Sequence, residues 1–111
     1  MKLITGLNPY GITYYLGIQS IGTPRANPNG VGLDGFLALA TELGARAVEL
    51  RDGWLREVEE AGGLPALRQR LESLDLVPVI SSGLHNGDVD ACIRWALALG
   101  ADRMRFALTP I

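Results

Sequence analysis

The apolar positions of this chain fall into short runs that alternate with stripes spaced three and four residues apart. The run over 12–18 is rich in β-branched and aromatic residues, which predicts a first strand. Further short apolar runs predict buried strands at 47–50, at 77–80 and at 103–108. Pro78 is compatible with the third strand only near its start or at an irregularity.

Three helices are predicted between these strands. The first begins near Asp34 and ends before Gly44, because a glycine there suits a left-handed C-terminal residue. The second has Pro65 in its first turn, and Asp88 or Asp90 can cap the third. The apolar stripes that predict these helices are Leu33, Phe36, Leu37, Ala40 and Leu43; Leu64, Leu67, Leu71 and Leu74; and Val89, Ile93, Ala96, Leu97 and Gly100.

The remaining segments are polar or dense in turn residues. Loops are predicted at 19–32 and 81–88, and the charged run 56–60 is interpreted as a solvated face. Tyr14 and Tyr15 are adjacent in the first predicted strand, so one of them should face inward. The order β-α-β-α-β-α-β predicts a parallel sheet with right-handed crossovers, in one α/β domain with four strands and three main helices.

An internal similarity relates the second strand to the fourth. The segment 43–50 (LGARAVEL) resembles 99–106 (LGADRMRF), and the shared register aligns Glu49 with Arg105. The neighbouring apolar side chains should face the helices, which places the two charges on the opposite face. Alternate strands of an eight-stranded barrel contribute to the same interior layer, so Glu49 and Arg105 are expected at one level, as a buried ion pair. An offset of one residue in either strand would instead send the charges outward.

Composition and charge limit the classes of protein. The chain has 111 residues, of which 48% are apolar and 20% charged, with a net charge of −2. One domain fits this length, and the absence of clustered Lys and Arg argues against a nucleic-acid partner. One cysteine, Cys92, and one histidine, His85, exclude a disulfide framework and any site that needs two imidazoles from this chain. Without a membrane-length apolar run or a signal peptide, we expect a cytoplasmic protein with no membrane partner.

The ordered series of elements resembles a known family. It is carried by the opening strand after Gly11 and by 32–35, 43–51, 79–83 and 99–105. Together these segments resemble the N-terminal half of the xylose-isomerase-like TIM barrels, the sugar phosphate isomerases and epimerases, which are distantly similar to apurinic-site endonucleases. At roughly 31 residues per βα unit of a barrel of about 250 residues, 111 residues hold about three and a half units. The resemblance therefore implies a partial (β/α)8 barrel domain over residues 1–111.

The resemblance also implies a chemistry. Family members use a divalent metal (Mn, Mg, Zn or Co) to polarise the oxygens of a hydroxy-ketone or hydroxy-aldehyde while acidic residues move a proton. The substrate would be a small sugar or sugar phosphate in carbohydrate metabolism. In epimerase-type members the metal ligands lie on later strands, expected beyond residue 111, so none is carried onto this sequence and the chain alone is expected to be inactive.

Four residues are candidates for substrate binding. Glu49 would contact substrate at the barrel mouth, or form a structural salt bridge to Arg105 or Arg51. Arg105 could bind a phosphate or carboxylate through its planar fork. His85 follows the third strand, at the end where barrel sites form, and is a candidate substrate contact or metal ligand or an ordinary loop residue. Trp54 would form an apolar wall for a sugar ring or cover the gap between helices.

Two hypotheses from other classes stay open beside the isomerase. A non-catalytic half-barrel would bury the open edges of its first and fourth strands by forming a homodimer. A small doubly wound domain would bind a nucleotide or phosphate, although no strand is followed by a Gly-x-Gly-x-x-Gly or Walker-type loop. A barrel like the apurinic-site endonucleases is a variant of the barrel-enzyme hypothesis.

Overall fold

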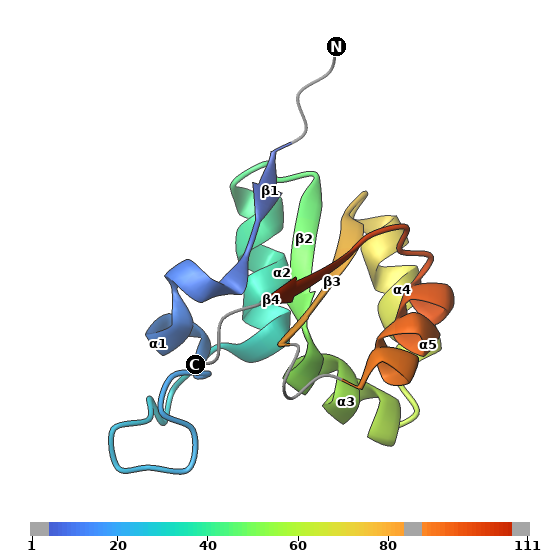
Figure 1. The fold of residues 1–111 in the computed structure, drawn as a ribbon. Helices are drawn as coiled ribbons and strands as arrows, with labels where there is room; N and C mark the ends of the chain where they lie inside the picture. The colour runs from blue at the N-terminus through green and yellow to red at the C-terminus, as the bar shows by residue number, and fades with distance from the viewer. Residues whose placement is uncertain (1–4, 84–87, 108–111) are drawn as a thin grey trace.

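Four parallel strands lie side by side in the order in which they occur in the chain (Figure 1). The computed structural model describes residues 5–83 and 88–107. The strands are β1 (Gly6–Leu7), β2 (Ala47–Arg51), β3 (Val77–Gly83) and β4 (Met104–Ala107). Each neighbouring pair is parallel. The prediction of an α/β fold with a parallel sheet is confirmed, and the arrangement is compatible with half of a barrel.

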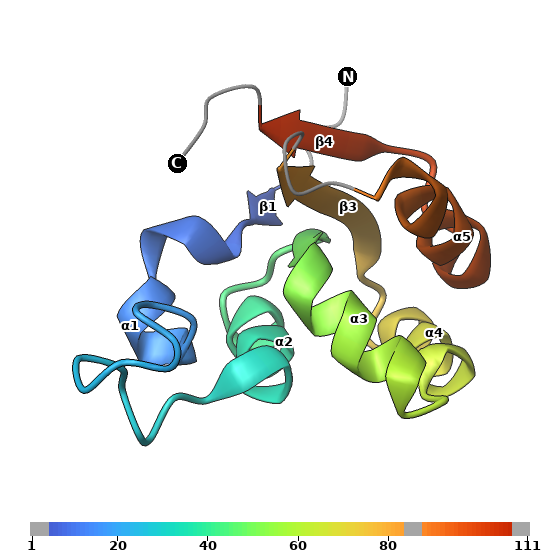
Figure 2. The same cartoon turned by 60° about the horizontal axis from the view of Figure 1, so that its bottom comes forward.

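The helices cover one face of this sheet. Figure 2 shows the four longer helices on the same side of the strands. They are α2 (Gly32–Glu42), α3 (Asp52–Glu60), α4 (Leu64–Ser73) and α5 (Val89–Leu99). A doubly wound domain has helices on both faces and reverses its strand order at a switch point. The sequential strand order and the single helical layer contradict the doubly wound hypothesis.

The predicted first strand at 12–18 is wrong. The first strand is β1, and it is followed by a 3₁₀ turn, η1 (Pro9–Gly11), and a short helix, α1 (Thr13–Leu16). The side chain of Asn8 caps the turn by accepting the Tyr10 backbone N–H at 2.9 Å. Gly17, with φ +81°, ends α1 in the left-handed region. These caps outweigh the β propensity of the run.

The loop at 19–32 returns the chain to the end of α1, where two glycines meet. A Cβ on Gly30 would lie 2.2 Å from the Cα of Gly17, so only glycine allows this approach. Tyr14 and Tyr15 are both exposed, because α1 presents them to solvent. The expectation that one of these tyrosines faces inward is therefore wrong.

Helix α3 was not predicted from the sequence. The segment 52–60 was interpreted as polar, and three charged side chains of the run 56–60 are indeed exposed. Trp54 and Leu55, however, are buried beside the sheet and make the segment amphipathic. A helix with only two buried residues has too short an apolar stripe to stand out in a sequence.

Helix α5 has the predicted position but buries a different face. The predicted residues Val89, Ile93 and Leu97 are exposed, with Leu97 exposed to 75%. The buried residues are Ala91, Cys92, Trp95, Ala96 and Leu99. Both sets follow helical spacing, and the set with tryptophan removes more apolar area from water. Asp88 caps the helix as predicted, its Oδ1 accepting the Ala91 N–H at 3.0 Å.

The core lies between the sheet and the helices. Val48 and Leu50 of β2 and Ile80 of β3 face the helices and are almost completely buried. They pack with the inner faces of α2 to α5, as predicted for strands whose apolar side chains meet the helices. The opposite face of the sheet remains uncovered by any helix among the described residues, and it carries the polar side chains that follow.

Candidate functional site

The uncovered face of the sheet, called the open face below, is defined by strand register. On β2, Glu49 alternates with the core residues and therefore points away from the helices, whereas the guanidinium of Arg51 lies over Trp54 of α3. On β3, Val79 lies opposite Glu49, and Ser81 lies opposite Arg51. On β4, Arg105 lies opposite Ser81. The middle of the open face therefore carries Glu49, Ser81 and Arg105.

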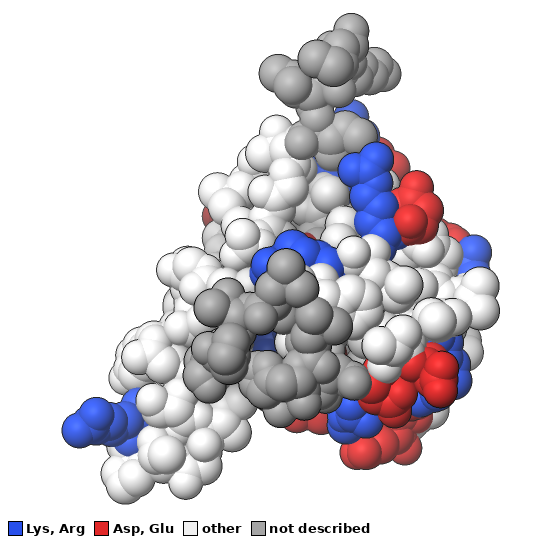
Figure 3. All heavy atoms as spheres, viewed as in Figure 1, with Lys and Arg blue, Asp and Glu red and all other residues white. Residues whose placement is uncertain are grey.

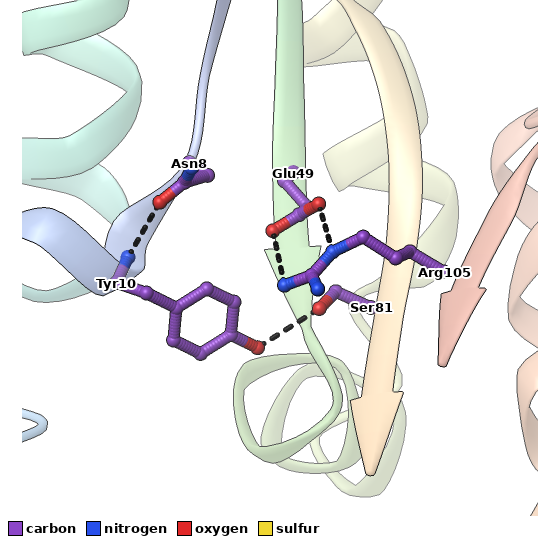
Figure 4. Close-up of polar contacts among 5 residues, drawn as sticks. All are labelled: Asn8, Tyr10, Glu49, Ser81 and Arg105. Carbon is purple, nitrogen blue, oxygen red and sulfur yellow. Dashed lines mark hydrogen bonds and ion pairs between the residues drawn. The ribbon is translucent and has the colours of Figure 1, made fainter. Parts of the chain in front are cut away.

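Glu49 and Arg105 form a forked ion pair on this face (Figure 4). Arg105 Nε donates to Glu49 Oε1 at 2.7 Å, and an Nη of Arg105 donates to Oε2 at 3.2 Å. The Glu49 side chain is only 14% exposed, whereas Arg105 is 51% exposed. Donation of hydrogen bonds to Glu49 raises the pKa of Arg105, against the opposing effect of partial burial. The predicted ion pair on the face away from the helices is confirmed, but it is only partly buried because Arg105 is half-exposed.

The two partners do not lie at the same position along the sheet. Glu49 is opposite Val79 and Arg105 is opposite Ser81, so the pair spans β3 diagonally with an offset of two residues. Two residues that lie opposite the same residue of β3 would instead be side by side. An offset of two residues over two strands is about one residue per strand, which is the stagger of an eight-stranded barrel with a shear of 8.

Tyr10 and Ser81 add two hydroxyl groups to the pair. The Tyr10 hydroxyl is hydrogen-bonded to Ser81 Oγ at 2.9 Å, and the Arg105 guanidinium lies 5.5 Å from the centre of the Tyr10 ring (Figure 4). Ser81 is almost fully buried although it was predicted in a loop, because β3 continues to Gly83. Sequence reasoning missed Tyr10. The Asn8-Pro9 cap was the available signal for a turn after β1, from which the Tyr10 hydroxyl reaches Ser81 of β3.

Two adjacent hollows lie on the open side, toward the amino ends of the strands. One of about 230 Å³ borders Glu49, and the other, of about 270 Å³, borders Arg103. Both are lined by Gly6, Ala47 and Val79, so the hollows form one depression beside the ion pair. Figure 3, which views this side, shows basic and acidic groups interspersed toward the side of α4 and α5.

Trp54 lies on the other side of the sheet. It is buried in the core and packs against Phe36, with 5.3 Å between ring centroids. It therefore covers the gap between α2 and α3, the second of its two predicted roles, and does not line the open face. The guanidinium of Arg51 lies 5.7 Å from the Trp54 ring centre, so the alternative salt bridge from Arg51 to Glu49 does not form.

A second polar contact at the carboxyl ends of β2 and β3 is structural. Ser82 Oγ donates to Asp52 Oδ2 at 2.8 Å, which joins the start of α3 to β3. Cys92 lies beside Ser82, and burial raises the pKa of its thiol. Cys92 is therefore the small buried helix residue that the sequence predicted.

A divalent metal was expected from the family resemblance. Among residues 5–83 and 88–107, no group of three or more His, Cys, Asp and Glu side chains could hold such an ion. His85, the weak candidate ligand, lies outside the described residues. No helix within the described ranges has the length and apolarity required to cross a membrane.

The fold and site define the class of protein as a singly wound parallel α/β domain with a polar open face. Comparisons with family models, with curated proteins and with solved structures found no match to this chain. The function must therefore be argued from the side chains of the open face.

Proposed function

We propose that this chain forms half of a (β/α)8 barrel that binds a small sugar or sugar phosphate over Glu49 and Arg105, in an isomerase or epimerase of the xylose-isomerase-like class. The observation that carries the proposal is the diagonal ion pair across β3. Its stagger matches that of side chains sharing one interior layer of a barrel. Barrel enzymes bind substrate in the mouth of the barrel, and this pair lies near the middle of β2 and β4, on the face that would line the interior.

The polar groups of Glu49, Arg105, Tyr10 and Ser81 suit a polyhydroxylated ligand. Arg105 uses two of its five N–H donors on Glu49, so three donors remain for a phosphate or a sugar oxygen. The Tyr10 hydroxyl, held by the almost fully buried Ser81, can donate or accept, which matches the dual character of a sugar hydroxyl. Glu49, held by Arg105 in one orientation, offers acceptor positions for neighbouring sugar hydroxyls.

These residues bind and orient substrate in the proposed barrel. No residue is assigned to the divalent metal that the resemblance implies, because the described residues contain no group of three or more His, Cys, Asp and Glu side chains that could hold an ion. Arg105 would neutralise the negative charge of a phosphate, while the Tyr10 hydroxyl, positioned by the buried Ser81, would hydrogen-bond to the sugar chain.

Titration calorimetry with D-ribulose 5-phosphate and with D-ribulose, each with and without Mn²⁺, tests this proposal. We expect the phosphorylated ketose to bind more tightly, and Arg105→Lys to weaken its binding about tenfold because the fork is lost. Tyr10→Phe should weaken both sugars.

Arg94→Lys is the matched control, since Arg94 forms a similar fork with Glu59 on the helical side. It should leave binding unchanged. Failure of both sugars to bind, or equal losses in Arg105→Lys and Arg94→Lys, would contradict the proposal.

A further inference from the structure

The open face and the two edges of the sheet have no cover among the described residues. β1 and β4 are the edge strands, so each pairs on one side only. Parallel sheets are normally covered on both faces, and unpaired edges promote association with another strand. We infer that a second copy of this chain closes the barrel, with β4 of each copy beside β1 of the other. This inference rests on the barrel architecture of the proposed function.

The stagger of the strands supports closure by two copies. Glu49 and Arg105 share a layer at about one residue of offset per strand. Two copies supply eight strands, and the same offset carried around eight strands gives a total shear of about 8. That is the shear of a closed eight-stranded barrel, so the diagonal offset of the pair is compatible with closure by a second copy.

The charges on the open face are self-complementary. A barrel layer contains four side chains from alternate strands, and one copy supplies two of them, Glu49 and Arg105. A second copy would complete the layer as glutamate, arginine, glutamate and arginine in turn around the barrel. The layer is then neutral, and each arginine lies between two carboxylates. One N–H donor of Arg105 that does not bind its own Glu49 would face the Glu49 of the other copy, and the others would stay open to a ligand.

Apolar side chains lie beside both edges. Tyr14 and Tyr15 are exposed on α1, on the side of β1, and Ile93 and Leu97 are exposed on α5, on the side of β4 (Figure 2). Pairing β4 with β1 of another copy would bring these two surfaces toward each other. Exposed apolar side chains grouped at an edge are typical of an association surface.

Sedimentation velocity with the full chain tests the inference. We expect a dimer of twice 11.9 kDa. Arg103 O accepts from the Ile80 N–H of β3, so by alternation the Met104 N–H faces the free edge. Met104→Pro removes that donor and should shift the protein to monomer, whereas Met104→Val keeps the donor and should remain dimeric. Ile93→Lys, which leaves β4 intact, should also shift the protein to monomer.

A wild-type monomer, an assembly larger than two, or a dimer that survives both Met104→Pro and Ile93→Lys would overturn the inference. Circular dichroism of each variant establishes that it is folded. The proposed function fails separately: a monomer that binds the sugar phosphate overturns only closure by a second copy, and a dimer that binds no sugar overturns only the sugar site.

Discussion

The Glu49–Arg105 pair makes a quantitative prediction, because its two partners differ in exposure. Arg105→Met leaves the Glu49 carboxylate, 14% exposed, without its two charge-assisted hydrogen bonds. Glu49→Gln leaves a guanidinium that is 51% exposed and can be hydrated. An orphaned buried charge is costlier than an exposed one, so Arg105→Met should destabilise more than Glu49→Gln.

The expected magnitudes follow from this difference. Losing the partner of a largely buried carboxylate should cost about 2 kcal/mol in Arg105→Met, and Glu49→Gln should cost about 1 kcal/mol. The double variant Glu49→Gln/Arg105→Met leaves no uncompensated charge and should cost about 0.5 kcal/mol. The interaction energy of the double-mutant cycle is then about −2.5 kcal/mol, well beyond the ~0.3–0.5 kcal/mol within which independent sites add.

Urea unfolding followed by circular dichroism measures the four free energies of unfolding. All four proteins are compared at one concentration, because association would change the apparent stability. Additive effects, or a double variant less stable than either single variant, would refute the reasoning that the pair is coupled on the open face. Equal costs of the two single variants would refute the argument from exposure.

Three further predictions concern the helical side and are measured by the same unfolding experiment. Leu99→Ala should lower the free energy of unfolding by about 2–5 kcal/mol, whereas Leu97→Ala on the same helix should change it by less than about 0.5 kcal/mol. A larger loss in Leu97→Ala than in Leu99→Ala would mean that the face predicted from the sequence is the buried one. Asp88→Ala should cost about 1 kcal/mol through loss of the helix cap, and Asp88→Asn should recover most of it. Hydrogen bonding to Arg94 lowers the pKa of Glu59, so this pair stabilises the fold above the ordinary glutamate pKa and loses that effect as the pH falls through the lowered value. Glu59→Gln should therefore be less stable than the wild type at pH 7 and equal to it in strong acid; a difference that persists there would contradict this account.

The sequence predicted the strands β2, β3 and β4 and the helices α2, α4 and α5, but it missed β1, α1 and α3. Strands at 47–50 and 77–80 are continuous apolar runs, which buried parallel strands require. The aromatic run at 12–18 has the same composition but is shaped by Asn8 and Gly17, one residue capping a turn and the other ending a helix. Local hydrogen bonds and a left-handed glycine determined this segment, and neither contributes to a hydrophobic pattern.

The site was predicted in the same uneven way. Glu49 and Arg105 were found because the internal similarity fixed their common face, which needs only the alternation along a strand. Their offset of two residues could not be predicted, since register depends on how neighbouring strands pair. Tyr10 was missed because its approach to Ser81 joins positions 71 residues apart in the chain.

A charged layer inside a barrel needs a reason, because an apolar pair of similar volume is often as stable or more stable than a buried ion pair. The position of Glu49 and Arg105 supplies one. The pair lies on the open face with Arg105 half-exposed, so its desolvation is incomplete and its unused donors remain accessible. If the pair served stability alone, Glu49→Gln/Arg105→Met would leave the molecule intact in every respect. In the proposed barrel the same double variant folds but loses both the sugar phosphate and the alternating charges that match a second copy.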